Sequence, residues 1–168
     1  TSILIDANQN YSKIYQSFFK NRTGYYEIVA VGEKSEVKQY TLYHDAPYLS
    51  TIGKRSDYVS NNKSVYDVNV KKIDDIVDIK ISKKGALLKL DIEGFELQAL
   101  KGAKDVLNIC NNVICEVSIS DDFPGGNNFD KINELMLKND FKIKDILRVP
   151  RVNHNSYPAQ VLDVVYGK

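Results

Sequence analysis

The 168-residue sequence predicts a single α/β domain, residues 1–168, with a mainly parallel three-layer sheet and an antiparallel pair of strands at its C-terminal end. Three observations lead to this prediction. Short strand patterns alternate with amphipathic helix patterns along most of the chain, which is typical of parallel sheets. The last two strand patterns follow one another without a helix, which indicates antiparallel pairing. No internal repeat or low-complexity segment divides the chain.

The first half of the chain contains four strand patterns and one helix pattern. A helix is predicted from Tyr11 to Phe18, where apolar residues recur at i, i+3, i+4 and i+7. The strands are short apolar or alternating segments, at residues 2–5, 27–31, 37–43 and 65–70. Residues 44–64 are predicted to form a loop, and a loop of that length in a compact domain is more often functional or disordered than idle.

The second half continues the alternation of strands and helices. The predicted elements are, in order, one or two helical turns at residues 73–77, strands at 86–92 and 113–117, helices at 97–107 and 129–136, and final strands at 141–149 and 160–166. The helix at 97–107 is predicted because Leu97, Leu100 and Leu107 line one face. The segment between the last two strands is too polar for a helix and predicts a long hairpin connection.

The strand at residues 86–92 carries charges where a strand inside an α/β sheet is usually apolar on both faces. Apolar Leu88, Leu90 and Ile92 alternate with three charged residues, so the period of two places those charges on one face. The charged residues are Lys89, Asp91 and Glu93. Gly94 follows as a turn, and a helix then begins. Open sheets bind ligands at the carboxyl edge of their strands, so this edge is the candidate site.

The composition excludes several classes of partner. Lysine and arginine total 23 and aspartate and glutamate total 22, without long blocks of either sign, so nothing favours nucleic acid or an anionic membrane as the main partner. No apolar run approaches the ~18 residues of a membrane-spanning helix. Cys110 and Cys115 are the only cysteines, and their number and spacing indicate neither a disulfide framework nor a metal site. We expect both to be reduced, in a cytoplasmic protein.

The start of the sequence is unusual. The first residue is Thr1, the only methionine is Met136, and a strand begins almost at once. We therefore expect the sequence to begin inside a larger fold.

The sequence resembles FkbM-type methyltransferases most clearly at residues 88–96, Leu-Lys-Leu-Asp-Ile-Glu-Gly-Phe-Glu, and at residues 100–103, Leu-Lys-Gly-Ala. Weaker similarities follow in the family's order, at residues 5–9, 30–34, 49–51, 70–76 and 114–116. The resemblance implies a Rossmann-like methyltransferase sheet and S-adenosylmethionine as the cofactor. It also implies methylation of a hydroxyl group, on a sugar, a glycan or another secondary metabolite.

One part of the family pattern has no counterpart here. The family's first strand and its Gly-rich turn, which hold the methionine end of the cofactor, are not found in this sequence. We therefore expect an N-terminally incomplete domain, with a strand missing between those at residues 2–5 and 86–92. Cofactor binding by this piece alone depends on what that strand contributes.

Five residues are candidates for cofactor binding, and one of them, Asp91, is also a catalytic candidate. Asp6 follows the first strand, where a carboxylate can accept hydrogen bonds from both ribose hydroxyls. An aspartate at this position also commonly caps a helix. The resemblance places Ala30, Val31 and Gly32 along the adenine ring, although the same residues fit an ordinary strand end.

Asp91, Lys89 and Glu116 are the catalytic candidates, at the ends of two strands expected to be neighbours. The resemblance places Asp91 nearest the transferred methyl group, where it would contact the cofactor and orient the acceptor or take its proton. Lys89 can hold Asp91 ionised or pair with Glu116. Glu93 can instead accept backbone N–H groups at the start of the next helix. Three carboxylates can bind Mg²⁺, but Asp91 lacks the adjoining Asp-Asp or Asp-Asn pair typical of metal-dependent methyltransferases, so no metal is predicted.

The predicted loops hold further candidates. His44 and His154 can act as bases near neutral pH, but both also fit exposed loop histidines without a role. Tyr48, Ser50, Thr51 and Tyr58 lie in the loop at residues 44–64 and can form part of a lid over the acceptor. A homo-oligomer is possible.

Two other functions remain open on the sequence alone. One is a non-catalytic Rossmann-like module for binding or assembly, in which the first strand is absent from the protein. The other is a different nucleotide enzyme on the same kind of sheet, such as a dehydrogenase. The charged stretch at residues 89–96 has no role in the dehydrogenase.

Overall fold

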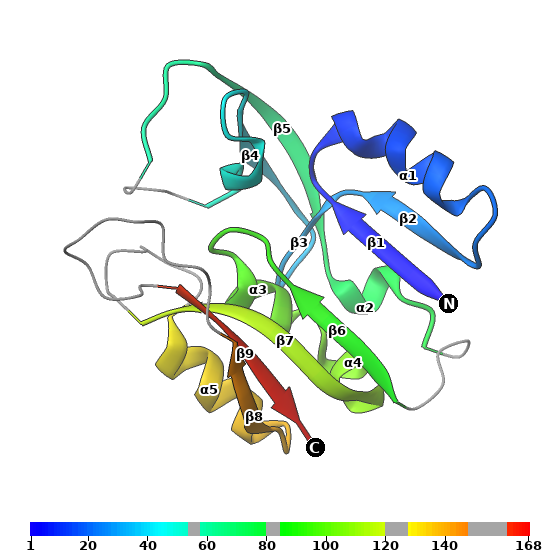
Figure 1. Ribbon diagram of the computed structural model, residues 1–168, viewed down its shortest axis with the longest axis vertical. Helices are drawn as coiled ribbons and strands as arrows, with labels where there is room; N and C mark the ends of the chain where they lie inside the picture. Colours follow the sequence, from blue (N-terminus) through cyan, green and yellow to red (C-terminus); the bar gives the residue numbers. More distant parts are fainter. Residues whose placement is uncertain (54–57, 80–84, 120–127, 148–160) are drawn as a thin grey trace.

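The structure is a computed structural model that describes residues 1–53, 58–79, 85–119, 128–147 and 161–168. Within these residues the strands form three sheets, of two, three and four strands. The two smaller sheets lie together at one end of the molecule and the four-stranded sheet lies at the other, as Figure 1 shows.

The two-stranded sheet contains the N-terminus. Strand β1 (Ser2–Asp6) pairs in parallel with β2 (Gly24–Ile28), and the short 3-10 helix η1 (Gln9–Tyr11) and α1 (Ser12–Phe19) connect them. The Asn8 side chain caps η1 by accepting a hydrogen bond from the backbone N–H of Asn10. The structure therefore confirms the strand predicted at residues 2–5 and the helix predicted from Tyr11 to Phe18. A crossover helix is the usual connection between two parallel strands.

The chain changes sheets at Val29, whose backbone N–H donates to the carbonyl of Asp6. Beyond it, β3 (Ala30–Val31) pairs in parallel with β5 (Lys63–Lys71). The single strand predicted at residues 27–31 is therefore wrong, since its two ends belong to different sheets.

Strand β5 also pairs along its length with β4 (Glu36–Tyr43), and this pair is antiparallel. The described residues of the connection form only the 3-10 helix η2 (Pro47–Leu49) and a short bridge between Thr41 and Thr51. A parallel pair needs a long crossover, usually a helix, so a connection without one favours a hairpin.

The four-stranded sheet is mixed. Strand β6 (Ala86–Leu90) pairs in parallel with β7 (Cys110–Ser118), as predicted. Strand β9 (Val161–Gly167) lies antiparallel to β7 on one side and to the edge strand β8 (Lys142–Leu147) on the other. The predicted antiparallel pair at the C-terminal end is confirmed.

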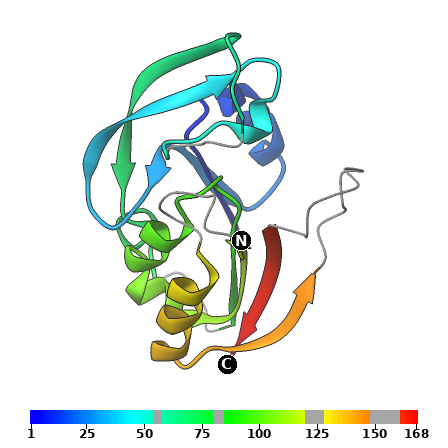
Figure 2. The same ribbon diagram turned by 90° about the vertical axis from the view of Figure 1, so that its left-hand side faces the viewer.

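Helices α3 (Glu96–Lys101), α4 (Lys104–Ile109) and α5 (Phe129–Lys138) lie on one side of the four-stranded sheet (Figure 2). Helix α2 (Ile73–Ile76) packs against α4. Side chains from these helices and from the covered face of the sheet form the main core, which includes Leu100, Val113, Cys115, Val117, Ile132, Met136, Val164 and Tyr166. The helix predicted at residues 97–107 is two helices, because the chain bends at Gly102.

The structure confirms a mixed α/β fold but only part of the predicted sheet. Among the described residues, three strand pairs are parallel and three are antiparallel, and they form three sheets instead of one. Strands β1 and β6 lie in different sheets, and the expectation of a strand missing between them stays a prediction. No helix in the described ranges is long and apolar enough to cross a membrane.

Gly102 provides a test of how the two halves of the fold meet. A Cβ atom at Gly102 would lie 2.0 Å from the carbonyl oxygen of Gly32, at the end of β3. The backbone of Gly102 itself is unstrained, with φ −90°. We therefore expect Gly102→Ala to lower the free energy of unfolding by about 1–3 kcal/mol through overpacking alone, measured by urea denaturation.

The neighbouring Lys101→Ala variant is the control for that substitution. Lys101 pairs with Glu33, and the two side chains are 39% and 54% exposed, so its loss should change the free energy of unfolding by less than about 0.5 kcal/mol. Equal stabilities of the Gly102→Ala variant and the unchanged protein would show that β3 and α3 do not meet this closely.

Candidate active site

A cavity of about 460 Å³ lies between the carboxyl end of β1, the β4–β5 hairpin and the turn that joins β6 to α3. This volume is within the range of about 300–1,000 Å³ typical of small-molecule sites. One wall comes from the first third of the chain, at residues 5–7, 11, 29–31, 40, 47–48 and 50–52. The opposite wall is the turn after β6, at residues 91–93 and 95.

Asp6 lies in the first wall with both carboxylate oxygens already engaged. Oδ1 accepts the backbone N–H of Asn8 at 2.8 Å, and Oδ2 accepts the Tyr15 hydroxyl at 2.7 Å. The cap of the following helical turn is Asn8, so the alternative reading of Asp6 as the helix cap is wrong. A carboxylate has about four lone-pair positions, so Asp6 retains capacity for a ligand in the cavity.

Tyrosines surround this carboxylate. Burial, with the Asp6 hydrogen bond next in importance, raises the pKa of Tyr15. Burial followed by the charge of Asp6 raises the pKa of Tyr40, which is 5% exposed and lines the cavity. Both phenols therefore stay neutral. Tyr11 and Tyr40 were not predicted as cavity residues, because their spacing fits ordinary helix and strand faces.

Two of the three residues predicted to bind adenine line the cavity, and the third does not. Ala30 and Val31 are buried and line the cavity as an apolar surface. Gly32 does not line it but lies behind the wall, where an added Cβ would meet Val70 Cγ1 at 2.8 Å and Phe95 Cε1 at 3.1 Å. Contact between Gly32 and a ligand stays a prediction.

The charged tip of β6 is arranged differently from the predicted alternation. The strand ends at Leu90, and Asp91 and Glu93 lie on the turn that follows, where both line the cavity. Lys89 lies outside the cavity wall and forms an ion pair with Asp91, with side chains 51% and 48% exposed. Burial lowers the pKa of Lys89, but the hydrogen bond and charge of Asp91 outweigh it and leave that pKa raised. Such an exposed pair adds little stability, and it orients the two side chains.

Beneath this turn lies Glu96, whose side chain is fully buried at the start of α3. Its carboxylate accepts the backbone N–H of Ile92 at 3.0 Å and of Gly94 at 3.1 Å. This role was predicted for Glu93, whereas in the structure Glu96 accepts these two backbone N–H groups. Burial raises the pKa of Glu96 to about 7, while the backbone donors act in the opposite direction. The sequence pattern that could have identified Glu96 was an acidic residue in the first turn of a helix after a glycine.

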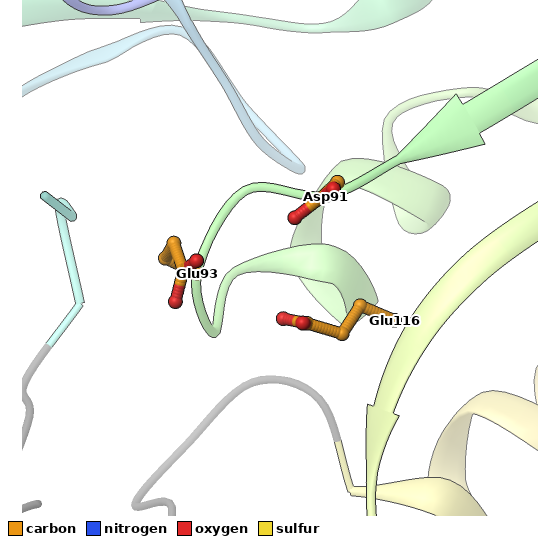
Figure 3. Close-up of side chains that lie close together, drawn as sticks. All are labelled: Asp91, Glu93 and Glu116. Atoms are coloured by element: carbon orange, nitrogen blue, oxygen red, sulfur yellow. The ribbon is translucent and has the colours of Figure 1, made fainter. Parts of the chain in front are cut away.

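Glu116 reaches the same region from β7. One carboxylate oxygen each from Asp91, Glu93 and Glu116 lie within 4.8 Å of one another, and Figure 3 shows the side chains facing a common space. Burial, with the charges of Glu93, Glu96 and Asp91, raises the pKa of Glu116 to about 8. Glu116 itself lies just outside the cavity wall.

Asp163, on β9, is paired in register with Glu116 and also contributes to its raised pKa. Asp163 was not predicted as a site residue, although it is an acidic residue inside the apolar run at 161–165, the same kind of pattern that identified Glu116. The cluster of carboxyl groups is therefore larger than predicted.

Three close carboxylates match the oxygen ligands that divalent cations prefer. Acidic groups at a protein surface also gather without an ion, so Asp91, Glu93 and Glu116 do not by themselves assign a metal. The expectation that the site holds no metal stays a prediction.

The other predicted candidates lie outside the carboxylate cluster, and some of them line the cavity. His44 Nε2 lies 2.7 Å from Ser64 Oγ in the hairpin, outside the cavity, and His154 lies outside the described residues. Of the predicted lid residues, Tyr48, Ser50 and Thr51 line the cavity. Tyr58 packs instead against the ring of Tyr43. Cys110 and Cys115 are buried and free.

The raised pKa of Glu116 predicts a pH-dependent stability. Its pKa rises from 4.5 in the unfolded chain to about 8 in the folded protein, so unfolding releases a proton between these values. The free energy of unfolding should therefore fall as pH rises from 5 to 8, by at most about 1.4 kcal/mol per pH unit for this group. Glu116→Gln should reduce that slope, measured by urea denaturation at several pH values.

Glu134→Gln is the matched control for this experiment. Glu134 is exposed, and its hydrogen bond and ion pair with Lys138 lower its pKa, so it is ionised in both states across the same pH range. Its substitution should leave the slope unchanged. A Glu116→Gln variant with the slope of the unchanged protein would contradict the assigned pKa.

Comparisons with known proteins agree on one family. A family model described as the methyltransferase FkbM domain matches residues 3–143. A search of curated proteins finds no match.

Among solved structures, the crystal structure of methyltransferase FkbM from Methylobacillus flagellatus KT is similar, with a TM-score of 0.56 and 17% sequence identity. The alignment covers 99% of this chain and 36% of that one, so this chain spans about a third of that protein's length. At this identity the similarity shows a shared fold. Because the family model covers most of the chain, the chain belongs to the methyltransferase FkbM domain family.

Proposed function

We propose that this domain transfers a methyl group from S-adenosylmethionine to a hydroxyl group of a small-molecule or glycan acceptor, such as a sugar or a secondary metabolite. Family membership supports a methyltransferase. The observation that carries the proposal is the cavity, which brings Asp6, the apolar pair Ala30 and Val31, and the carboxylates of Asp91 and Glu93 to one space.

The residues of this cavity fit the chemical groups of the proposed cofactor. A ribose diol is recognised by a carboxylate, and Asp6 supplies one at the end of β1. A flat aromatic base needs an apolar surface, and buried Ala30 and Val31 supply it. A positively charged sulfur is favoured beside anionic groups, and Asp91 and Glu93 supply them on the opposite wall.

The protein's own contribution to the reaction is mainly position and charge. S-adenosylmethionine, when bound, supplies an electrophilic methyl group on a positively charged sulfur. Asp91 accepts a hydrogen bond from the acceptor hydroxyl and orients its oxygen, which converts a bimolecular encounter into a positioned one. Lys89 keeps the Asp91 side chain turned toward the rim through their ion pair.

Glu116 completes this set as a group that can hold and pass on a proton. With its pKa near 8, it holds a proton at neutral pH more readily than an ordinary glutamate and takes one from a neighbouring group when ionised. One of its carboxylate oxygens lies within 4.8 Å of one from Asp91, a separation that a single bridging water can span to relay a proton. We also propose a cytoplasmic location, supported by two free, buried thiols.

Asp91→Asn tests the proposed function most directly. The substitution keeps the shape of the side chain but removes its charge and its capacity to take a proton. We expect methyl transfer, measured as release of S-adenosylhomocysteine with a panel of hydroxylated acceptors, to fall by about 100-fold or more. Binding of S-adenosylhomocysteine, measured by calorimetry, should change much less, because that product carries no positive charge on sulfur.

Asp67→Asn is the control, since Asp67 is an exposed residue of β5 outside the cavity wall. It should keep both the rate and the affinity of the unchanged protein. If the unchanged protein binds no S-adenosylhomocysteine, the non-catalytic module becomes the better assignment. If Asp91→Asn is as active as the Asp67→Asn control, Asp91 has no part in catalysis.

A further inference from the structure

The two walls of the cavity come from segments far apart in the sequence, and a hydrogen bond joins them. The Thr51 hydroxyl donates to the backbone carbonyl oxygen of Glu93 at 2.7 Å, across 42 residues of sequence. Thr51 is 2% exposed and lines the cavity on the hairpin side. Glu93 lines it on the other side.

Thr51 is itself held firmly on its own wall. Its backbone N–H and carbonyl both bond to Thr41 of β4, at 3.1 and 2.9 Å. The backbone N–H of Gly53 donates to Thr51 Oγ1 at 2.8 Å. Thr51 Oγ1 therefore accepts one hydrogen bond from Gly53 and donates its single proton to the Glu93 carbonyl. The geometry is that of a donor fixed in place for this carbonyl.

The carbonyl that accepts this bond belongs to a peptide unit held on both sides. The N–H of the Glu93–Gly94 peptide is the backbone N–H of Gly94, which donates to the buried Glu96 carboxylate. The carbonyl of the same peptide accepts from Thr51. Rotation of this peptide would break both bonds at once. Thr51 and Glu96 therefore determine together which way the peptide faces.

The conformation of the turn makes this restraint necessary. Glu93 has φ 59° and Gly94 has φ 97°, so both residues are left-handed. The left-handed region is unfavourable for a residue with a side chain and persists only where surrounding bonds enforce it. Without the bond from Thr51, the partly buried carbonyl of Glu93 would lose this hydrogen-bond donor. That loss would favour other backbone conformations of the turn.

We propose that Thr51 is a positioning residue of the candidate active site. Its hydroxyl fixes the orientation of the Glu93–Gly94 peptide and thereby holds the carboxylates of Asp91 and Glu93 against the opposite wall of the cavity. The link to methyl transfer rests on the proposed function, whereas the effect of Thr51 on the turn can be measured without any ligand.

Amide hydrogen exchange followed by NMR tests the proposal in the ligand-free protein. Thr51→Val keeps the shape of the side chain and removes the hydroxyl, so the Gly94 amide should exchange about tenfold faster or more. Thr51→Ser restores the hydroxyl, and its Gly94 exchange rate should stay within about threefold of the unchanged protein. Amides of β7, such as that of Cys115, should be unaffected in both variants.

Thr41→Val is the matched control, because it makes the same substitution at the other residue of the bridge, whose bonds to Thr51 are backbone bonds. It should leave exchange at Gly94 unchanged. Equal Gly94 exchange rates in Thr51→Val and Thr41→Val would overturn the proposal. A Thr51→Ser variant with fast Gly94 exchange would also overturn it, even if Thr51→Val does not fold.

Calorimetry with S-adenosylmethionine, whose positively charged sulfur is attracted by the carboxylates of Asp91 and Glu93, then connects the turn to the cavity. The dissociation constant should rise about tenfold in Thr51→Val and return toward its original value in Thr51→Ser. Absence of binding to the unchanged protein would contradict the proposed function, while the exchange data would still decide the role of Thr51. Fast Gly94 exchange combined with unchanged affinity would show that this turn does not shape the binding site.

Discussion

The buried carboxylate of Glu96 is the constraint on which the candidate site depends. A charged side chain removed from water is costly unless its oxygens are hydrogen-bonded, and here the backbone N–H groups of Ile92 and Gly94 provide those bonds. Each such bond is worth about 1.5–3 kcal/mol, which exceeds the about 1–2 kcal/mol cost of the left-handed Glu93. The chain therefore turns sharply after β6, and this turn presents Asp91 and Glu93 to the cavity.

The consequence is a concentration of negative charge at one rim of the fold. Asp91, Glu93 and Glu116 face one another, and Glu96 and Asp163 add to the field at Glu116. Lys89 offsets part of this charge through Asp91. Such crowding favours protonation of the Glu116 carboxyl group near neutral pH, and it equally favours binding of a cation. A methyl donor with a positively charged sulfur suits this rim better than a neutral or anionic cofactor would.

The sequence predicted this region because its signals are local. The alternation at residues 86–92 located β6, and the charges at its tip predicted that Asp91 and Glu116 would meet, since carboxyl ends of parallel neighbours lie at one edge. Asp6, Ala30 and Val31, which the resemblance assigned to the cofactor, line one cavity in the structure. The resemblance at residues 88–103 then supplied the family, which composition and periodicity do not determine.

Other features depend on contacts that no local pattern encodes. The apolar run at residues 28–31 continues through Val29 although the chain changes sheets there. The bend at Gly102 follows from its close approach to Gly32, a residue 70 positions earlier. Glu96 was not recognised because glutamate is almost always exposed, and burial becomes favourable only once the turn folds over it. The bond from Thr51 to Glu93 likewise exists only in the folded chain.

The most direct test of this account is a backbone amide NMR titration of the protein with S-adenosylhomocysteine. The account predicts that the resonances of both cavity walls shift together, including Ala7, Val31 and Ile92, while amides of β8 such as Ile143 stay in place. Shifts confined to residues outside these walls, or no shift at millimolar ligand, would contradict the claim that this cavity holds the cofactor.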